Sequence, residues 1–350
     1  MGANQEHGEK SESFADGQKH DVLSNLDRIS LLRNQEEPSK QTSSKIVELP
    51  HLEHNSGKHA APDAMVRLPE NFDPNKPINL VIYNHGFYDS AKSSFYGANL
   101  DEQMKSAPPN TILVSPEWQS RPAAKSSDEG GLSAPGAFKG MLEDIFKRIP
   151  ELDGKSLDDV AKISIISHSA GYTPAMSEIY DNGLEGKISS VTLLDSLYNG
   201  TGFDKWLKDN IRELNSGEKQ FSNIFLHSRN KGTELCSKYE AARLEKMLAD
   251  AGLPKTSLLE DYSHEQQVLG ADDFRKHSII FKESAATHSD KTPHMSLPNL
   301  YVGEIERAAS QRDNNATLSG GTVDSSPEHL ERNPWLNIQI DDEGAEHRHW

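Results

Sequence analysis

A serine held between small residues is the most chemically suggestive feature of this chain. Residues 163–171 read I-S-I-I-S-H-S-A-G, so a β-branched run ends at Ser169. In a nucleophile elbow a buried strand turns sharply into a helix, and small residues two positions either side of the nucleophile prevent clashes in the strained turn. Gly171 occupies the second of these positions, and Ser167 replaces the glycine expected at the first. We therefore take Ser169 as the candidate nucleophile.

The chemistry of a serine nucleophile requires further groups. A serine hydroxyl attacks a carbonyl only when a base takes its proton, and the base needs a carboxylate that orients it. Backbone N–H groups must also stabilise the negative charge that develops on the carbonyl oxygen. We expect these donors to be Ala170, directly after the nucleophile, and Gly86 or Phe87 in an earlier loop. A glycine at position 86 would let that loop approach the substrate closely.

The elements around Ser169 predict an α/β fold with a mostly parallel central sheet flanked by helices. Short apolar runs alternate with helix-like stretches, which is typical of βαβ units whose sheet is buried on both faces. The expected strands are 80–84, 111–115, 164–167, 191–194, 224–226 and 279–281, and the expected helices include 137–148, 202–214 and 238–251.

These features resemble the α/β-hydrolase superfamily over about residues 65–306. His85-Gly86 after an early strand is similar to the family's oxyanion-loop signature, Ser169 to its elbow and His294 to its late histidine. The segment L-D-S-L-Y at 194–198 also resembles a group of poorly characterised bacterial members. The resemblance implies a three-layer sandwich and a serine hydrolase with the chain order serine, acid, histidine. It carries no substrate information.

The base and the acid each have two candidates. His294 stands directly before residues 297–308, which read as a closing helix, and is our first choice; His288 is the alternative. Asp195 ends the strand after the elbow, where side chains project toward the ligand crevice of an open α/β sheet. The superfamily more often places the acid one strand later, where the chain offers Glu234 in an expected loop.

Four further residues are candidates for the walls of a substrate pocket: His85, His168, Tyr88 and Trp118. Both histidines are expected to pack or hydrogen-bond around the site rather than to act as the base. Packing in the core is the alternative for the aromatic side chains.

Composition predicts a domain at 45–310 between two polar ends. The hydrophobic content of 34% is low for a folded chain of 350 residues. Residues 1–44 are expected to be disordered, because they contain too few apolar side chains to offset the entropy of ordering. Residues 311–350 are similar and expected to be mobile. An apolar island around Trp335 could dock on the domain or bind a protein partner.

Charge and motifs exclude several classes of function. A net charge of −17 argues against binding to nucleic acid or anionic lipid. No apolar run approaches the roughly 20 residues of a membrane span, and no secretory signal is recognisable. The single Cys236 fits a reducing compartment, so we expect a cytoplasmic protein, with signal-independent export as the alternative. His264-Glu265 begins like a zinc motif, but Val268 occupies the second ligand position, so neither a metal nor another cofactor is expected.

The sequence therefore predicts a serine hydrolase that cleaves an ester, thioester or amide through an acyl-enzyme. The alternative is a non-catalytic protein that uses the same fold as a binding or scaffolding surface.

Overall fold

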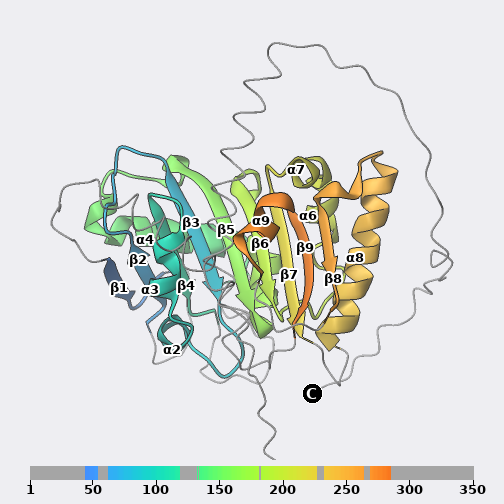
Figure 1. Ribbon diagram of the computed structural model, residues 1–350. Helices are drawn as coiled ribbons and strands as arrows, with labels where there is room; N and C mark the ends of the chain where they lie inside the picture. Colours follow the sequence, from blue (N-terminus) through green and yellow to red (C-terminus); the bar gives the residue numbers. More distant parts are fainter. Residues whose placement is uncertain are drawn as a thin grey trace, which may run out of the picture.

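A computed structural model of the chain describes residues 44–53, 62–118, 132, 134–180, 183–226, 232–263 and 269–284. These residues build a nine-stranded sheet in the order β1-β2-β4-β3-β5-β6-β7-β9-β8 (Figure 1). The strands are β1 (Lys45–Leu49), β2 (Ala64–Leu68), β3 (Ile78–Asn84), β4 (Thr111–Pro116), β5 (Val160–His168), β6 (Ile188–Leu194), β7 (Gln220–Leu226), β8 (Leu258–Asp261) and β9 (Ile279–Ser284).

The sheet is parallel except at one edge. Strand β2 runs antiparallel to both β1 and β4, whereas all pairs from β4 to β8 are parallel. The arrowheads of the parallel strands therefore point to one edge of the sheet, the lower edge in Figure 1. This arrangement confirms the predicted α/β class, and it is that of the α/β-hydrolase fold.

Strand β3 marks the point where the chain changes direction across the sheet. From β3 the chain moves to β4 on one side and then returns to β5 on the other. Because βαβ crossovers are right-handed, the connections on the two sides of β3 lie on opposite faces. In open α/β sheets, ligands bind outside the carboxyl ends of the strands at such a switch point. The ends of β3 and β5 are therefore where a site is expected.

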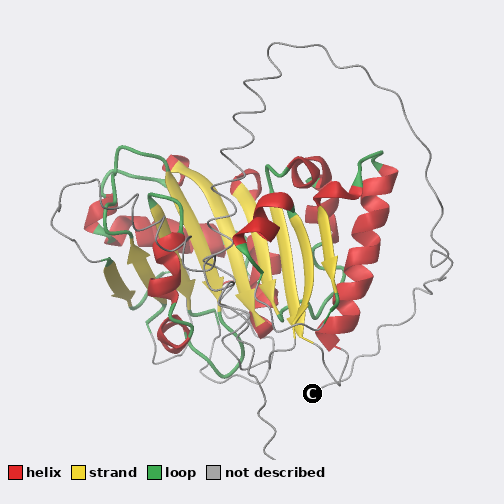
Figure 2. Ribbon diagram, in the orientation of Figure 1, coloured by secondary structure: helices red, strands yellow, loops and turns green. Residues whose placement is uncertain are grey.

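Helices cover both faces, as Figure 2 shows. Alternate residues of β3 point to opposite faces: Val81 and Tyr83 pack with one apolar cluster, Leu80 and Ile82 with the other. The first cluster includes residues of α2 (Ala91–Gly97), α3 (Leu100–Gln103) and α9 (Ala271–Lys276). The second includes residues of α4 (Ala137–Arg148), α5 (Tyr172–Glu178), α6 (Asp204–Asp209), α7 (Ile211–Ser216) and α8 (Gly232–Asp250). Single 3₁₀ turns are η1 (Met104–Ser106), η3 (Pro150–Leu152), η4 (Leu157–Asp159), η5 (Ser169–Gly171), η6 (Glu185–Lys187) and η7 (Lys255–Ser257).

The elements differ from the sequence prediction in four respects. The six predicted strands are confirmed and extended, but β1, β2 and β8 were not predicted. The helix predicted at 202–214 is wrong as a single element, because Asn210 separates α6 from α7 with φ −112° and ψ 19°. The Asn210 Nδ2 donates to the Trp206 carbonyl at 2.7 Å, the kind of side-chain bond that competes with helix continuation. Helix α8 begins at Gly232 rather than at 238, whereas α4 has its predicted bounds.

The described helices include none that combines the length and the apolar character needed to cross a bilayer. Strand β1 begins at Lys45, the first residue of the predicted domain. The predicted closing helix at 297–308 and the two polar ends lie outside the described residues.

A polar cluster around the buried Glu240 joins α8 to α6. Glu240 has no exposed surface, and its carboxyl group contacts the guanidinium of Arg243, which also donates to Asp204 at 3.2 Å. Burial raises the pKa of Glu240 to about 9, although the Arg243 charge lowers it. The folded chain therefore retains the Glu240 proton over a pH range in which the unfolded chain has released it.

We predict that Glu240→Gln reduces the loss of stability at alkaline pH. Between the ordinary pKa of 4.5 and the folded value of about 9, the unfolded state binds fewer protons at this group, so its contribution to stability falls as pH rises. Thermal unfolding measured at pH 5, 7 and 9 should show the variant gaining Tm relative to the wild-type chain as pH increases. The exposed Glu218→Gln serves as the control and should show no such gain. A constant Tm difference across this range for Glu240→Gln would contradict the prediction.

Candidate active site

Ser169 lies in the turn predicted from the sequence. Strand β5 ends at His168, and the turn η5 leads directly from Ser169 into α5. The backbone of Ser169 has φ 52°, in the left-handed region, and the residue is 8% exposed. A conformation of this kind costs a non-glycine residue about 1–3 kcal/mol and persists only where the surroundings enforce it.

Two neighbouring strand ends enforce this turn. A Cβ at Gly171 would lie 2.5 Å from the carbonyl oxygen of Asn84, the last residue of β3, so no other residue fits without displacing the backbone. On the opposite side, Ser196 Oγ donates to the Ser169 carbonyl at 2.7 Å. Ser167, at the first small position of the elbow, pairs in register with Asn84 and is fully buried. The elbow is thus fixed between β3 and the segment after β6.

The loop after β3 lies against Ser169. A Cβ at Gly86 would be 3.0 Å from Ser169 Cβ and 3.5 Å from Ser169 Oγ. Phe87 follows, and its N–H is the second oxyanion donor considered in the sequence analysis. Ala170 lies in the first helical turn, where an N–H has no partner within the helix. The structure therefore brings Gly86 and Ala170 together at the elbow, with Phe87 next along the chain.

The predicted pocket residues divide into two groups. His85 and Trp118 are fully buried beneath the loop, and Trp118 Nε1 donates to the His85 carbonyl at 2.9 Å. Neither side chain has surface open to solvent, so a role as pocket wall fits them poorly. Tyr88, in contrast, is 68% exposed and has φ 62°. The His168 Nδ1 lies 3.2 Å from the position of a Cβ on Gly86, close to the nucleophile.

Asp195 follows β6 directly and is held rigidly. It is 5% exposed, with φ 45°, and its N–H donates to the Ile224 carbonyl at 2.7 Å. Its Oδ1 accepts hydrogen bonds from Thr233 Oγ1 at 2.5 Å and from the Leu226 N–H at 3.3 Å. Donors of this kind fix the plane of the carboxylate, which a residue that orients a histidine requires.

Glu234 occupies a different environment. The prediction that it stands in a loop is wrong, because it lies in the first turn of α8. Its carboxylate pairs with Lys238 Nζ at 2.6 Å, one helical turn further along, and the side chain is 13% exposed. This is the common i, i+4 pair of a helix surface. The loop prediction failed because Gly232-Thr233 reads as a break, whereas the helix begins there.

Tyr198 is a site residue that the sequence analysis did not assign. The Ser169 side chain lowers the pKa of the Tyr198 phenol, so the two side chains interact, and the Tyr198 ring lies 5.6 Å from that of Tyr172. Burial, together with the nearby Asp195 charge, raises the pKa of Tyr198 to about 12, so the phenol remains protonated at neutral pH. The same contacts bring Asp195 and Ser169 to one locality around Tyr198. No spacing in the sequence distinguishes this tyrosine from the others.

The candidate bases His294 and His288 lie outside the described residues, so both assignments stay predictions. His227, after β7, lies outside them as well. Within the described ranges, no group of three or more His, Cys, Asp or Glu side chains could hold a metal ion.

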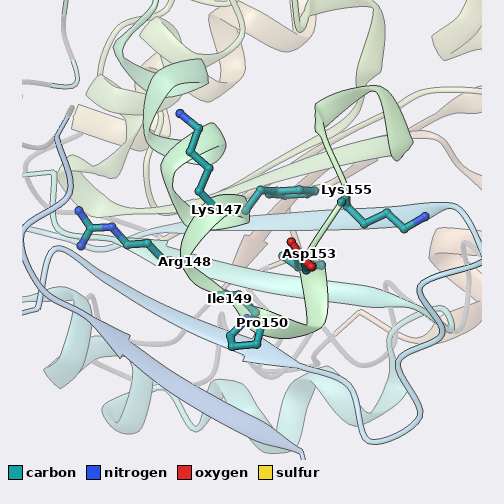
Figure 3. A pocket seen from close by; sticks show the side chains of 9 residues that line it. Lys147, Arg148, Ile149, Pro150, Asp153 and Lys155 are labelled. Carbon is teal, nitrogen blue, oxygen red and sulfur yellow. The ribbon is translucent and has the colours of Figure 1, made fainter.

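A hollow of about 410 Å³ lies at the end of α4 (Figure 3). It adjoins the segment that leads into the amino end of β5, whereas Ser169 follows the carboxyl end. Lys147, Arg148 and Lys155 point in different directions in Figure 3 and do not converge on a common point. The Arg148 guanidinium already donates to the carbonyls of Pro50 and His51 at 2.8 and 2.5 Å. This hollow is therefore separate from the candidate active site.

Comparison with known proteins yields distant structural likenesses. No protein-family model and no curated protein matches the chain. The feruloyl esterase module of Clostridium thermocellum is 16% identical, with 76% of this chain and 90% of that chain covered and a TM-score of 0.44. An S-formylglutathione hydrolase from Agrobacterium tumefaciens is 12% identical, with 78% and 98% covered and a TM-score of 0.42. A fluorophosphonate-binding serine hydrolase of Staphylococcus aureus is 12% identical, with 77% and 98% covered and a TM-score of 0.40.

At such identities and TM-scores these likenesses say nothing about the chemistry of this chain. The assignment of the fold rests on the strand order and on the elbow between β5 and α5.

We predict that Asp195→Asn and Glu234→Gln differ sharply in their effects on turnover. If Asp195 orients the base and stabilises its charged form, its amide should reduce ester turnover by roughly three orders of magnitude or more without unfolding the chain. Glu234→Gln weakens the pair with Lys238 within α8, so its cost should be below about tenfold. Steady-state hydrolysis of a p-nitrophenyl ester, with Tm as the check on folding, measures both. Near-normal turnover in Asp195→Asn with collapse in Glu234→Gln would transfer the role to Glu234.

Proposed function

We propose that this chain is a serine hydrolase that cleaves an ester, thioester or amide bond through an acyl-enzyme. The observation that supports it most strongly is the backbone of Ser169, held at φ 52° between the carboxyl ends of β3 and β6. A strained turn at a topological switch point presents a side chain to the ligand crevice, and the surrounding contacts maintain that strain.

In the first half of the proposed reaction, Ser169 Oγ attacks the carbonyl carbon of the substrate. His294, or His288 in its place, takes the hydroxyl proton as the new C–O bond forms, and Asp195 stabilises the imidazolium. The N–H groups of Ala170 and of Phe87 or Gly86 stabilise the oxyanion. When the tetrahedral intermediate collapses, the histidine gives its proton to the leaving alcohol, thiol or amine, and the acyl group stays on Ser169.

In the second half, water replaces the leaving group. The histidine takes a proton from water, the hydroxide attacks the acyl carbon, and the carboxylic acid leaves as Ser169 regains its proton. Tyr198 is protonated at neutral pH at its ordinary pKa of 10.0 and more firmly so at the raised pKa of about 12, so its hydroxyl can donate to an oxygen near Ser169 throughout the cycle. All proton transfers use side chains of this chain, and the scheme requires neither metal nor cofactor. We keep the cytoplasm as the proposed compartment.

We predict that a fluorophosphonate probe labels the wild-type chain and not Ser169→Ala. Such probes react with a serine made nucleophilic by its neighbours, and alanine retains the Cβ and therefore the packing against Gly86. Ser167→Ala is the matched control: it lies two residues away on β5, and in the described part of the chain its buried hydroxyl has no hydrogen-bond partner. Its labelling rate should stay within about threefold of wild type, because removal of an unbonded hydroxyl leaves no partner unsatisfied.

The readout is the modified peptide identified by mass spectrometry, with circular dichroism to establish that each variant is folded. Absence of labelling in a folded wild-type chain would overturn the proposal and favour the non-catalytic binding protein.

A further inference from the structure

A buried pair, His85 and Glu117, lies directly beneath the loop that approaches the nucleophile. His85 follows β3 and Glu117 follows β4, and the parallel pairing of these strands brings their carboxyl ends together. The two side chains are 0% and 1% exposed. A histidine and a carboxylate removed from water must satisfy each other or nearby backbone groups. The proposed hydrolytic reaction assigns neither residue a part in proton transfer.

Both ring nitrogens of His85 have a partner. Nδ1 lies 2.9 Å from the Gly86 carbonyl oxygen, and Nε2 lies 3.1 Å from Glu117 Oε1. A carbonyl oxygen can only accept, so Nδ1 carries a hydrogen in this contact. Glu117 Oε2 accepts from the N–H of Ala91 at 2.9 Å, which fixes the carboxylate from the first turn of α2. These two contacts, which we call the clamp, engage both ring nitrogens of His85. The imidazole therefore cannot serve as the base for Ser169 while they persist.

The clamp acts on the peptide that carries an oxyanion donor. The Gly86 carbonyl and the Phe87 N–H belong to one planar peptide unit, and the described residues contain no cis peptide. In a trans peptide the C=O and N–H point in opposite directions, so the atom that holds the carbonyl also sets the direction of the N–H. Gly86 lies against the nucleophile, since a Cβ on it would be 3.0 Å from Ser169 Cβ.

We propose that His85, held in place by Glu117, is a positioning residue that orients the Gly86–Phe87 peptide so that its N–H stabilises the oxyanion at Ser169. This inference rests on the proposed serine hydrolase function. The pair stabilises one orientation of the Gly86–Phe87 peptide. In the alternative orientation the peptide plane is flipped, so that the Gly86 carbonyl faces the substrate. A carbonyl in that position would repel the developing negative charge, so turnover depends on the clamp although neither side chain touches the substrate.

The test compares two replacements of His85 that each keep one of its contacts. The amide nitrogen of asparagine can take the place of Nδ1 and donate to the Gly86 carbonyl, whereas that of glutamine reaches the place of Nε2 and donates to Glu117. Both remove the ring that stacks 5.4 Å from Trp118, so both lose similar packing. If His85 has only a structural role, His85→Asn and His85→Gln should lower activity equally. If His85 positions the peptide, only His85→Gln should lose activity.

We expect His85→Gln to lower kcat for a p-nitrophenyl ester by about tenfold to a hundredfold with KM within about threefold, because a misdirected oxyanion donor weakens the transition state alone. His85→Asn should retain kcat within about threefold of wild type. The affinity for phenylboronic acid, whose serine adduct is tetrahedral and anionic, should fall in His85→Gln by the same factor as kcat/KM. Equal kcat in the two variants, or a loss in proportion to Tm in both, overturns the positioning role.

Glu117→Gln supplies a second test should neither His85 variant fold. Its amide oxygen can accept from the N–H of Ala91 and its amide nitrogen can donate to His85 Nε2, so both contacts of this side chain are kept. We expect kcat within about threefold of wild type and an unchanged pH–rate profile, because the pair positions a peptide and transfers no proton. A shifted limb of the profile contradicts the inference. A folded wild-type chain that neither hydrolyses the ester nor reacts with a fluorophosphonate overturns the proposed function, and with it this inference.

Discussion

The site depends on one close approach between two backbone segments, in which the Asn84 carbonyl meets the backbone of Gly171. Because no Cβ fits at position 171, the end of β3 and the start of α5 are in direct contact. That contact lies at the switch point of the sheet, so it determines where the loop after β3 meets the turn after β5. The proximity of Gly86 to Ser169 follows from it. A side chain at Gly171 would separate the proposed oxyanion loop from the proposed nucleophile.

Backbone strain accumulates around this contact. Three residues near the site have positive φ values: Ser169 directly after β5, Asp195 directly after β6, and Tyr88 in the loop after β3. Each such residue costs about 1–3 kcal/mol, which the two apolar clusters on either face of the sheet must offset. Hydrogen bonds from nearby side chains also stabilise the strained residues. Ser196 Oγ donates to the Ser169 carbonyl, and Thr233 Oγ1 donates to the Asp195 carboxylate. The conformation of the site therefore depends on these hydrogen bonds as well as on the residues that are proposed to react.

Local signals made the fold and the turn at Ser169 predictable from the sequence. A β-branched run that ends between small residues specifies the turn at Ser169, because the constraint acts on neighbours in the chain. The support network was not predictable, since its partners are far apart: Thr233 and Asp195 are separated by 38 positions and His85 and Glu117 by 32. Glu234 was misplaced in a loop because Gly232 reads as a helix breaker, although α8 begins there. The histidines proposed as the base follow β9, beyond the described residues.

The most direct test of the account is detection of the acyl group itself. Wild-type chain mixed with p-nitrophenyl acetate and acid-quenched within milliseconds should show a burst of nitrophenol, and mass spectrometry should find one acetyl group on the peptide that contains Ser169. The acetyl group should disappear once the ester is consumed, as water completes the second half of the reaction. Hydrolysis of the ester without an acetyl group on Ser169, or with acetylation of other side chains only, would contradict the account.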